Sequence, residues 1–159
     1  MTKREMAFNE LASLLSPEMK NWMIDIDKML IEGGCSATVD IKKNRFTYTS
    51  KATKKIVCKF DINADGITVM PNGNHLPQSN GIIAHLPEHM ITDMKNGKEC
   101  GVCAKNNPNF IQCKHGGPYM YTIENKNYNR CRYYGFGFRA DSSHERELLK
   151  EWIEMELAI

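Results

Sequence analysis

The first 33 residues carry the apolar spacing of two helices. Met6, Leu11 and Leu14 recur near helical intervals before the chain reaches Ser16 and Pro17. Serine at this point can cap a second helix, and proline suits the first helical position because its missing N–H is not needed there. Apolar residues then share one helical face until two glycines end the helix. These apolar residues are Met19, Trp22, Met23, Ile26, Met29 and Leu30. We predict a helical N-terminal segment over residues 1–33.

From residue 35 the apolar period changes from helical to two. Alternation of apolar and polar residues is typical of strands that bury one face and expose the other. The turn-forming stretches "KN", "SKAT" and "NADG" separate the runs. The alternating apolar residues are Ala37, Val39, Ile41, Phe46, Tyr48, Ile56, Cys58, Phe60, Ile62, Ile67 and Val69. The pattern predicts an antiparallel β-meander over residues 35–70.

The second half of the chain mixes loops, a hairpin and helices. "PNGNHLPQSNG" is expected to be a loop, and residues 86–97 a short helix. Residues 99–138 are expected to form a cysteine loop followed by a β-hairpin that turns near Glu124 to Asn127. Ser142 and Glu145 have the spacing of a capping box, and amphipathic spacing follows them, so residues 142–159 are predicted to be a C-terminal helix.

Length and composition favour one folded domain. The chain has 159 residues, of which 42% are hydrophobic and 25% charged, and it shows no linker or repeat. We predict a single α+β domain over residues 1–159. Its antiparallel sheet would carry the N-terminal and C-terminal helices on one face, with a loop pinned by zinc.

Targeting signals and charge narrow the setting. The N-terminal residues lack the continuous apolar core of a signal peptide, and no run approaches the roughly 18 apolar residues of a membrane span. We therefore expect a cytoplasmic protein with no membrane partner, in a compartment that keeps thiols reduced. The net charge of +2 does not demand a nucleic-acid partner.

Four cysteines form the strongest chemical motif. Cys100, Cys103, Cys113 and Cys131 follow the pattern C-x2-C-x9-C-x17-C. Four thiolates at such spacing can close a tetrahedral zinc site with no open position, so the metal would be structural rather than catalytic. Because the last two cysteines do not form a C-x2-C pair, His115 is a rival fourth ligand.

Two other roles for the cysteines stay open. The stretch "CGVC" resembles a thioredoxin-type pair, so Cys100 and Cys103 are candidates for a thiol redox switch. The stretch behind the pair is poor helix, and disulfides would need an oxidising compartment. Cys58 has the inward register of its strand and is expected to behave as a small buried hydrophobe, whereas Cys35 is ambiguous.

Basic and aromatic residues suggest two kinds of binding surface. A basic sheet face with nearby aromatics could hold nucleic acid, although a solvated surface is the simpler explanation. This face would use Lys42, Arg45, Lys55, Lys59 and Arg132. The second hairpin is rich in aromatic residues that could line a ligand pocket or simply fill the core. The pocket candidates are Tyr121, Tyr133, Phe136 and Phe138.

The run "GPYMYTIENKNYNRCRYYGFGF", together with the earlier cysteines and "HERELLKEWIEMEL", resembles a family of small uncharacterised bacterial proteins of low-GC Gram-positive organisms. The resemblance depends on Cys100, Cys113, Cys131, Arg132 and Tyr133. It supports zinc binding but implies no activity.

No nucleophile, phosphate loop or other catalytic motif accompanies the scattered histidines His75, His85 and His89. We therefore expect a zinc-stabilised, non-enzymatic module that binds a small ligand or a protein partner. The alternatives are nucleic-acid binding on the basic sheet face and redox switching at the C-x2-C pair.

Overall fold

The alternating pattern from Cys35 onward forms an antiparallel sheet. The computed structural model describes residues 1–76, 80–97, 115 and 117–158. Four strands follow one another as a meander, and a short fifth strand pairs with the last of them, so that the order across the sheet is β1-β2-β3-β4-β7. The strands are β1 (Cys35–Asp40), β2 (Arg45–Ser50), β3 (Ile56–Asn63), β4 (Gly66–Pro71) and β7 (Phe138–Arg139). The α+β class and the meander are confirmed.

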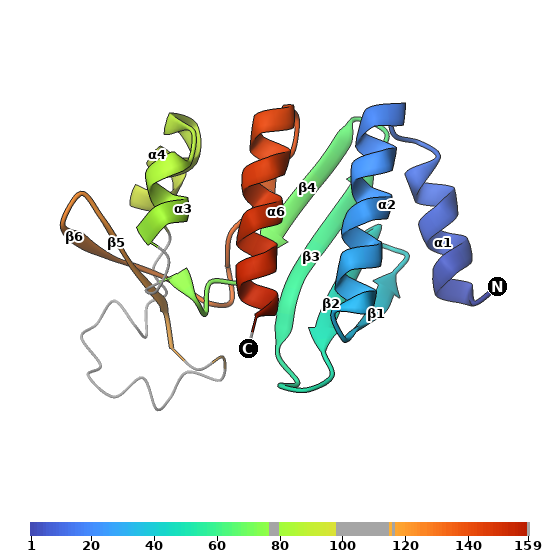
Figure 1. Ribbon diagram of the computed structural model, residues 1–159, viewed down its shortest axis with the longest axis horizontal. Helices are drawn as coiled ribbons and strands as arrows, with labels where there is room; N and C mark the ends of the chain where they lie inside the picture. Colours follow the sequence, from blue (N-terminus) through green and yellow to red (C-terminus); the bar gives the residue numbers. More distant parts are fainter. Residues whose placement is uncertain (77–79, 98–114, 116, 159) are drawn as a thin grey trace. The chain divides into compact units, whose positions relative to one another are not determined.

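Helices α1 (Lys3–Ala12), α2 (Pro17–Glu32) and α6 (Ser143–Leu157) lie on the same face of this sheet (Figure 1). Ser142 begins α6 as predicted, because its hydroxyl accepts a hydrogen bond from the Glu145 backbone N–H at 3.1 Å. Ser16 caps α2 in the same way, with its hydroxyl 3.4 Å from the Met19 nitrogen. The packing of N-terminal and C-terminal helices on one face is therefore confirmed.

The core between this face and the helices consists of large side chains. On the strands they are Phe46, Tyr48, Phe60, Ile62, Ile67 and Val69, and on the helices Met23, Ile26, Leu30, Leu149, Trp152 and Ile153. Burying each such side chain stabilises the fold by about 1.5–3 kcal/mol. Trp152 also satisfies its indole N–H, which donates to the Asn72 carbonyl at 2.8 Å. Because side chains alternate along a strand, this core fixes which side chains point to the opposite face.

The chain divides into two compact units. The first contains Met1–Asn72 and Gly137–Ile159, and the second contains Gly73–Phe136, inserted between β4 and β7. The described elements of the second unit are α3 (Asn80–His85), α4 (Glu88–Lys95), β5 (Tyr119–Ile123) and β6 (Lys126–Arg130). The sequence has no linker composition at either junction, so it gave no sign of this division within the expected single domain.

Two local features differ from the expected element bounds. Helix α3 begins at Asn80, within the stretch expected to be a loop. Phe138, which was expected in the region of the second hairpin, instead pairs with Val69 of β4. The chain leaves the hairpin after Arg130, where residues 131–135 turn and Gly135 takes a φ of 59°. The predicted hairpin turn itself is confirmed, since Glu124 and Asn125 form a two-residue loop with φ values of 51° and 66°.

Candidate functional site

Two arginines and two aromatic rings form a continuous series of contacts in the second unit. The rings of Tyr119 and Phe136 stack with centroids 5.6 Å apart. The guanidinium of Arg132 lies 4.3 Å from the Tyr119 ring centroid, and that of Arg130 lies 4.7 Å from the Phe136 centroid. Each cation–π contact is worth about 0.5–2 kcal/mol, so these residues stabilise one another. Arg130 ends β6, and Arg132 follows it by two residues. Because the guanidinium groups of both are held, the position of Cys131 between them in the sequence is restricted as well.

Hydrogen bonds hold Arg130 in place. Its guanidinium donates to the Asp93 carbonyl at 2.6 Å, to the Asp93 carboxylate at 3.1 Å and to the Gly135 carbonyl at 3.0 Å. The side chain is buried, and among the described residues its Nε–H has no hydrogen-bond partner. The sequence does not reveal that this arginine is buried, because its hydrogen-bond acceptors are distant in the chain or belong to the backbone.

Arg132 is fixed at its guanidinium by two further residues. Its Nε donates to the Gly117 carbonyl at 3.1 Å, and Nη1 donates to the side-chain oxygen of Asn74. Asn74 carries no sequence signal for this role. Arg132 is therefore a structural residue of the second unit, anchored to the residue that precedes β5 by two positions.

Cys131 lies between these two arginines and is buried. Its carbonyl accepts a hydrogen bond from the Gly135 N–H at 2.9 Å, which closes the turn after β6. On the other side of Arg130, the backbone of Gly97 approaches so closely that a Cβ added there would lie 3.0 Å from Arg130 Nε. Arg130 thus lies against Gly97, while Arg132 bonds to Gly117, and these two glycines flank residues 98–116.

The other predicted metal ligands are only partly covered. Cys100, Cys103 and Cys113 lie outside the described residues. His115 is exposed, and its ring lies 5.0 Å from that of Tyr133. Within the described ranges no three His, Cys, Asp or Glu side chains are grouped so as to hold a metal ion. Of the four cysteines predicted to bind a metal, the structure describes Cys131.

An exposed aromatic group lies on the turn that Cys131 begins. Tyr133 is 70% exposed and Tyr134 is 58% exposed, and their rings meet edge to face at 5.6 Å. With His115 they form what we call the aromatic turn. Large exposed tyrosines on a turn supply rigid contact area for a partner at low entropic cost.

The four residues proposed for a ligand pocket have different environments. Tyr121 and Phe136 are buried with ring centroids 5.8 Å apart, and the Tyr121 hydroxyl donates to the Met94 carbonyl at 2.6 Å. Tyr133 lies on the surface. Phe138 belongs to the first unit, where its ring lies 5.8 Å from Trp152. Tyr121, Phe136 and Phe138 are thus buried, whereas Tyr133 is exposed.

The residues proposed for nucleic-acid binding divide between the two units. Lys42 and Lys55 occupy the turns at opposite ends of β2, and Lys59 lies between them on β3, facing away from the helices. Burial, together with nearby Arg45 and Lys43, lowers the pKa of the Lys59 ammonium group. Arg45 forms a two-bond ion pair with Asp61, with distances of 2.7 and 2.9 Å. Arg132 belongs to the second unit, as described above.

The two remaining cysteines are buried in the first unit. Cys58 lies on the inward register of β3, as the alternation predicted, and Cys35 begins β1. Burial raises the pKa of both thiols, and the neighbouring Cys35 raises that of Cys58 further. Because the thiolate is the reactive form, these two side chains are poor nucleophiles at neutral pH.

In the parts of the chain that the structure describes, no helix has the length and apolar character needed to cross a membrane. Compared with known proteins, the chain matches no family model, no curated protein and no solved structure.

Proposed function

We propose that this chain is a non-enzymatic binding module whose second unit is held by a structural zinc ion, bound by Cys100, Cys103, Cys113 and Cys131. The observation that carries the proposal is the position of Cys131 between Arg130 and Arg132. These arginines contact Gly97 and Gly117, the described residues on either side of the segment with the other three cysteines.

The lengths of chain involved support a shared site. Cys100 follows Gly97 by three residues, and Cys113 precedes Gly117 by four. An extended chain spans at most about 3.3–3.6 Å per residue, so these cysteines can lie no more than about 10–15 Å from glycines that already contact the neighbours of Cys131. Cys103 shares a C-x2-C pair with Cys100 and would bind with it.

The charges near Cys131 also fit a zinc–thiolate centre. Four thiolates around one Zn²⁺ carry an excess of negative charge, which second-shell donors and cations commonly stabilise. Arg130 and Arg132 flank Cys131 in the sequence, and the buried Nε–H of Arg130 is a donor that has no partner among the described residues. With all four positions taken by sulfur, the zinc would have no site for water or substrate, so its role would be structural.

The proposed binding surface is the aromatic turn of His115, Tyr133 and Tyr134, and the proposed partner is a protein. Zinc bound to Cys131 would fix the first residue of the turn over residues 131–135 and so pre-organise the two exposed tyrosines on it. Tyrosine is enriched at protein interfaces because one side chain offers a large apolar area and a hydroxyl.

The ligand assignment is tested by zinc stoichiometry in a competition assay with a chromogenic chelator. We expect Cys131→Ser to lose tight zinc binding. His115→Ala should keep it, because the proposed fourth ligand is the Cys131 thiolate and not the His115 imidazole. Cys35→Ala is the matched control for losing a buried thiol elsewhere. Tight zinc binding by Cys131→Ser, or its loss in His115→Ala alone, would contradict the assignment.

The binding surface is tested by affinity capture with the zinc-loaded protein. A partner that contacts the aromatic turn should be captured by the wild type, lost with Tyr133→Ser/Tyr134→Ser, and retained by Tyr128→Ser, a control on β6 of the same hairpin. Removing zinc should also release it. Capture that is equal for the double variant and the control would rule out this surface.

A further inference from the structure

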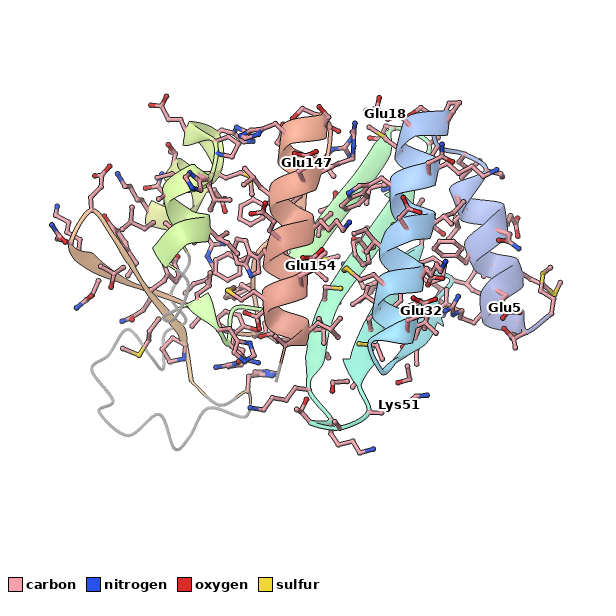
Figure 2. All side chains as sticks on the ribbon, viewed as in Figure 1. Glu5, Glu18, Glu32, Lys51, Glu147 and Glu154 are labelled. Carbon is pink, nitrogen blue, oxygen red and sulfur yellow. The ribbon has the colours of Figure 1, made fainter. Side chains whose placement is uncertain are left out.

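Charge in the first unit is segregated between its two layers. Helices α1, α2 and α6 contain eleven acidic and six basic side chains, whereas residues 33–72, which form β1–β4 and their turns, contain seven basic and three acidic ones. Figure 2 shows Glu18, Glu32, Glu147 and Glu154 on the helical layer and Lys51 beside the turn between β2 and β3. The small net charge of the chain therefore conceals one acidic layer and one basic layer.

The sheet face that points away from the helices carries mainly polar side chains, many of them with hydroxyl groups, although Ile56 and Met70 also lie on it, opposite Thr49 and Lys59. Ser36, Thr38, Thr47, Thr49 and Thr68 lie on it together with Lys59, on the register opposite to the buried residues. The aromatic rings of β2 and β3 point the other way, into the core. In the described residues of this unit, all three helices pack on the core side of the sheet. This face thus offers hydrogen-bonding groups but no ring on which a base could stack.

Lysines lie at both ends of this face and in its middle. Lys42 and Lys43 occupy the turn before β2, and Lys55 precedes β3 at the other end of β2. β2 has six residues, so the two ends are about 20 Å apart. Lys59 lies between them, directly opposite Thr47. Burial lowers the pKa of the Lys59 ammonium group, and the nearby cations Arg45 and Lys43 lower it further.

Asp61 is the acidic residue nearest the middle of this face, and Arg45 neutralises it. The two oxygens of the Asp61 carboxylate accept hydrogen bonds from the Arg45 guanidinium at 2.7 and 2.9 Å. Asp40 lies opposite Arg45 at one end of the face, and the three cations Lys42, Lys43 and Lys59 outnumber it, so the charge here is positive. We call Lys42, Lys43, Lys55, Lys59, Thr47 and Thr49 the lysine face.

We propose that the lysine face binds double-stranded RNA through its phosphates and 2′-hydroxyls, without reading the sequence. Lysine and threonine side chains are typical donors to phosphate and sugar oxygens. Binding of a single strand depends largely on stacking against aromatic rings, which this face does not present. The acidic helical layer on the other side of the unit would repel the polymer and so restrict it to this face.

The shape of the surface favours RNA over DNA. The major groove of B-DNA admits a helix or a two-stranded ribbon, which is narrower than this sheet. The minor groove of A-form RNA is wide and shallow, and it displays the 2′-hydroxyls at its surface. A sheet with short hydroxyl side chains in the middle and lysines at both ends can lie across such a groove and reach phosphates on either side. This inference concerns the first unit and does not depend on zinc in the second.

The test uses the full-length zinc-loaded protein and fluorescence anisotropy with a labelled RNA duplex of mixed sequence. The DNA duplex and the RNA single strand of the same sequence serve as competing probes. We expect the RNA duplex to bind more tightly than either, with affinity that falls steeply from about 50 to 200 mM salt because each phosphate contact releases counterions.

Two triple variants compare the lysine face with the helical layer as the site of RNA binding. Lys42→Gln/Lys43→Gln/Lys55→Gln removes three charges from the lysine face, and Lys20→Gln/Lys28→Gln/Lys150→Gln removes three from exposed positions on α2 and α6. The first should lower the slope of log affinity against log salt by about three and weaken binding at low salt on the order of a hundredfold. The second should leave both unchanged.

A third variant tests the hydroxyls without changing charge. Thr47→Val/Thr49→Val keeps β-branched residues in the strand, and it should reduce the preference for RNA over DNA while keeping the salt slope. Equal loss in both lysine variants would overturn the proposal, as would equal affinity for the DNA duplex or tighter binding of the single strand. Absence of RNA binding at low salt, with or without binding to anionic vesicles, would overturn it as well.

Discussion

Gly97 provides a sharp test of how tightly the second unit packs around Arg130. In Gly97→Ala the added Cβ would lie 3.0 Å from Arg130 Nε, 3.1 Å from the Tyr121 hydroxyl and 3.3 Å from Arg130 Nη2. These contacts are tighter than most carbon contacts in proteins, so Arg130 and Tyr121 would each have to shift by a few tenths of an ångström. Neither is free to do so, because Tyr121 donates to the Met94 carbonyl and Arg130 donates to Asp93 and Gly135.

The expected cost follows from two opposing terms. Overpacking a fixed site usually costs about 1–3 kcal/mol. Replacing glycine by alanine restricts the unfolded chain, which returns about 0.4–1 kcal/mol. We therefore expect Gly97→Ala to lower the free energy of unfolding by about 1–2 kcal/mol. For a chain of this length that corresponds to a fall in Tm of roughly 2–8 °C.

The matched control is Gly81→Ala in α3, where an added Cβ meets no atom within 4 Å. Alanine is favoured over glycine in a helix, so this variant should be about 0.5–1 kcal/mol more stable than the wild type. Urea unfolding followed by circular dichroism measures both variants under the same conditions. If Gly97→Ala is as stable as Gly81→Ala, then Arg130 and Tyr121 are not held as described.

Three further predictions concern the first unit. Tyr48→Phe removes the hydroxyl that donates to the Asp27 carboxylate at 2.6 Å, and it should cost about 1.5–3 kcal/mol in urea unfolding; a change below 0.5 kcal/mol would mean that this bond contributes little. Arg146 and Glu18 form an ion pair at 2.5 Å, yet Arg146→Ala should lower the free energy of unfolding several times more than Glu18→Ala. The reason is that Arg146 is buried and also donates to two backbone carbonyls, whereas the Glu18 side chain is 71% exposed. Equal costs in urea unfolding would show that the ion pair dominates. The free energy of unfolding should fall as pH rises above about 9, because the Cys58 thiol ionises there in the unfolded chain while burial keeps it protonated in the folded one. In urea titrations Cys58→Ala should therefore lose less stability at alkaline pH than the wild type. An equal loss would mean that other groups cause the decline.

Much of the first unit is predictable because its signals are local. Period-two alternation predicts the buried face of β2 and of β3 from Cys58 to Ile62, and Ser16, Pro17 and Ser142 mark helix starts within a few residues of sequence. The alternation is wrong at Ile56, which is exposed while Val57 is buried, because the pairing of β2 with β3 is irregular at Tyr48 and Thr49. Strand β7 was not predictable in the same way. It has two residues, and its formation depends on pairing with β4, about 70 residues earlier in the chain. Helix α3 is a single short element in a stretch rich in turn-forming residues.

The surroundings of the candidate zinc site depend on contacts that leave no trace in the sequence. Nothing near Arg130 indicates that its guanidinium would be buried against Asp93, or that Asn74 would accept a hydrogen bond from Arg132. The charge segregation of the first unit is different, since it follows from counting charges within each predicted element rather than over the whole chain. The net charge of +2 for the whole chain does not reveal this segregation.

Four cysteines holding one structural zinc ion would define the second unit of this protein. The most direct test is the mass of the purified full-length protein by native mass spectrometry, kept reducing throughout, before and after treatment with a chelator. We expect one zinc per chain, its loss on chelation, and a lower Tm for the metal-free protein. A metal-free protein of unchanged stability, with free or readily oxidised thiols at Cys100 and Cys103, would contradict it and favour a redox role for that pair.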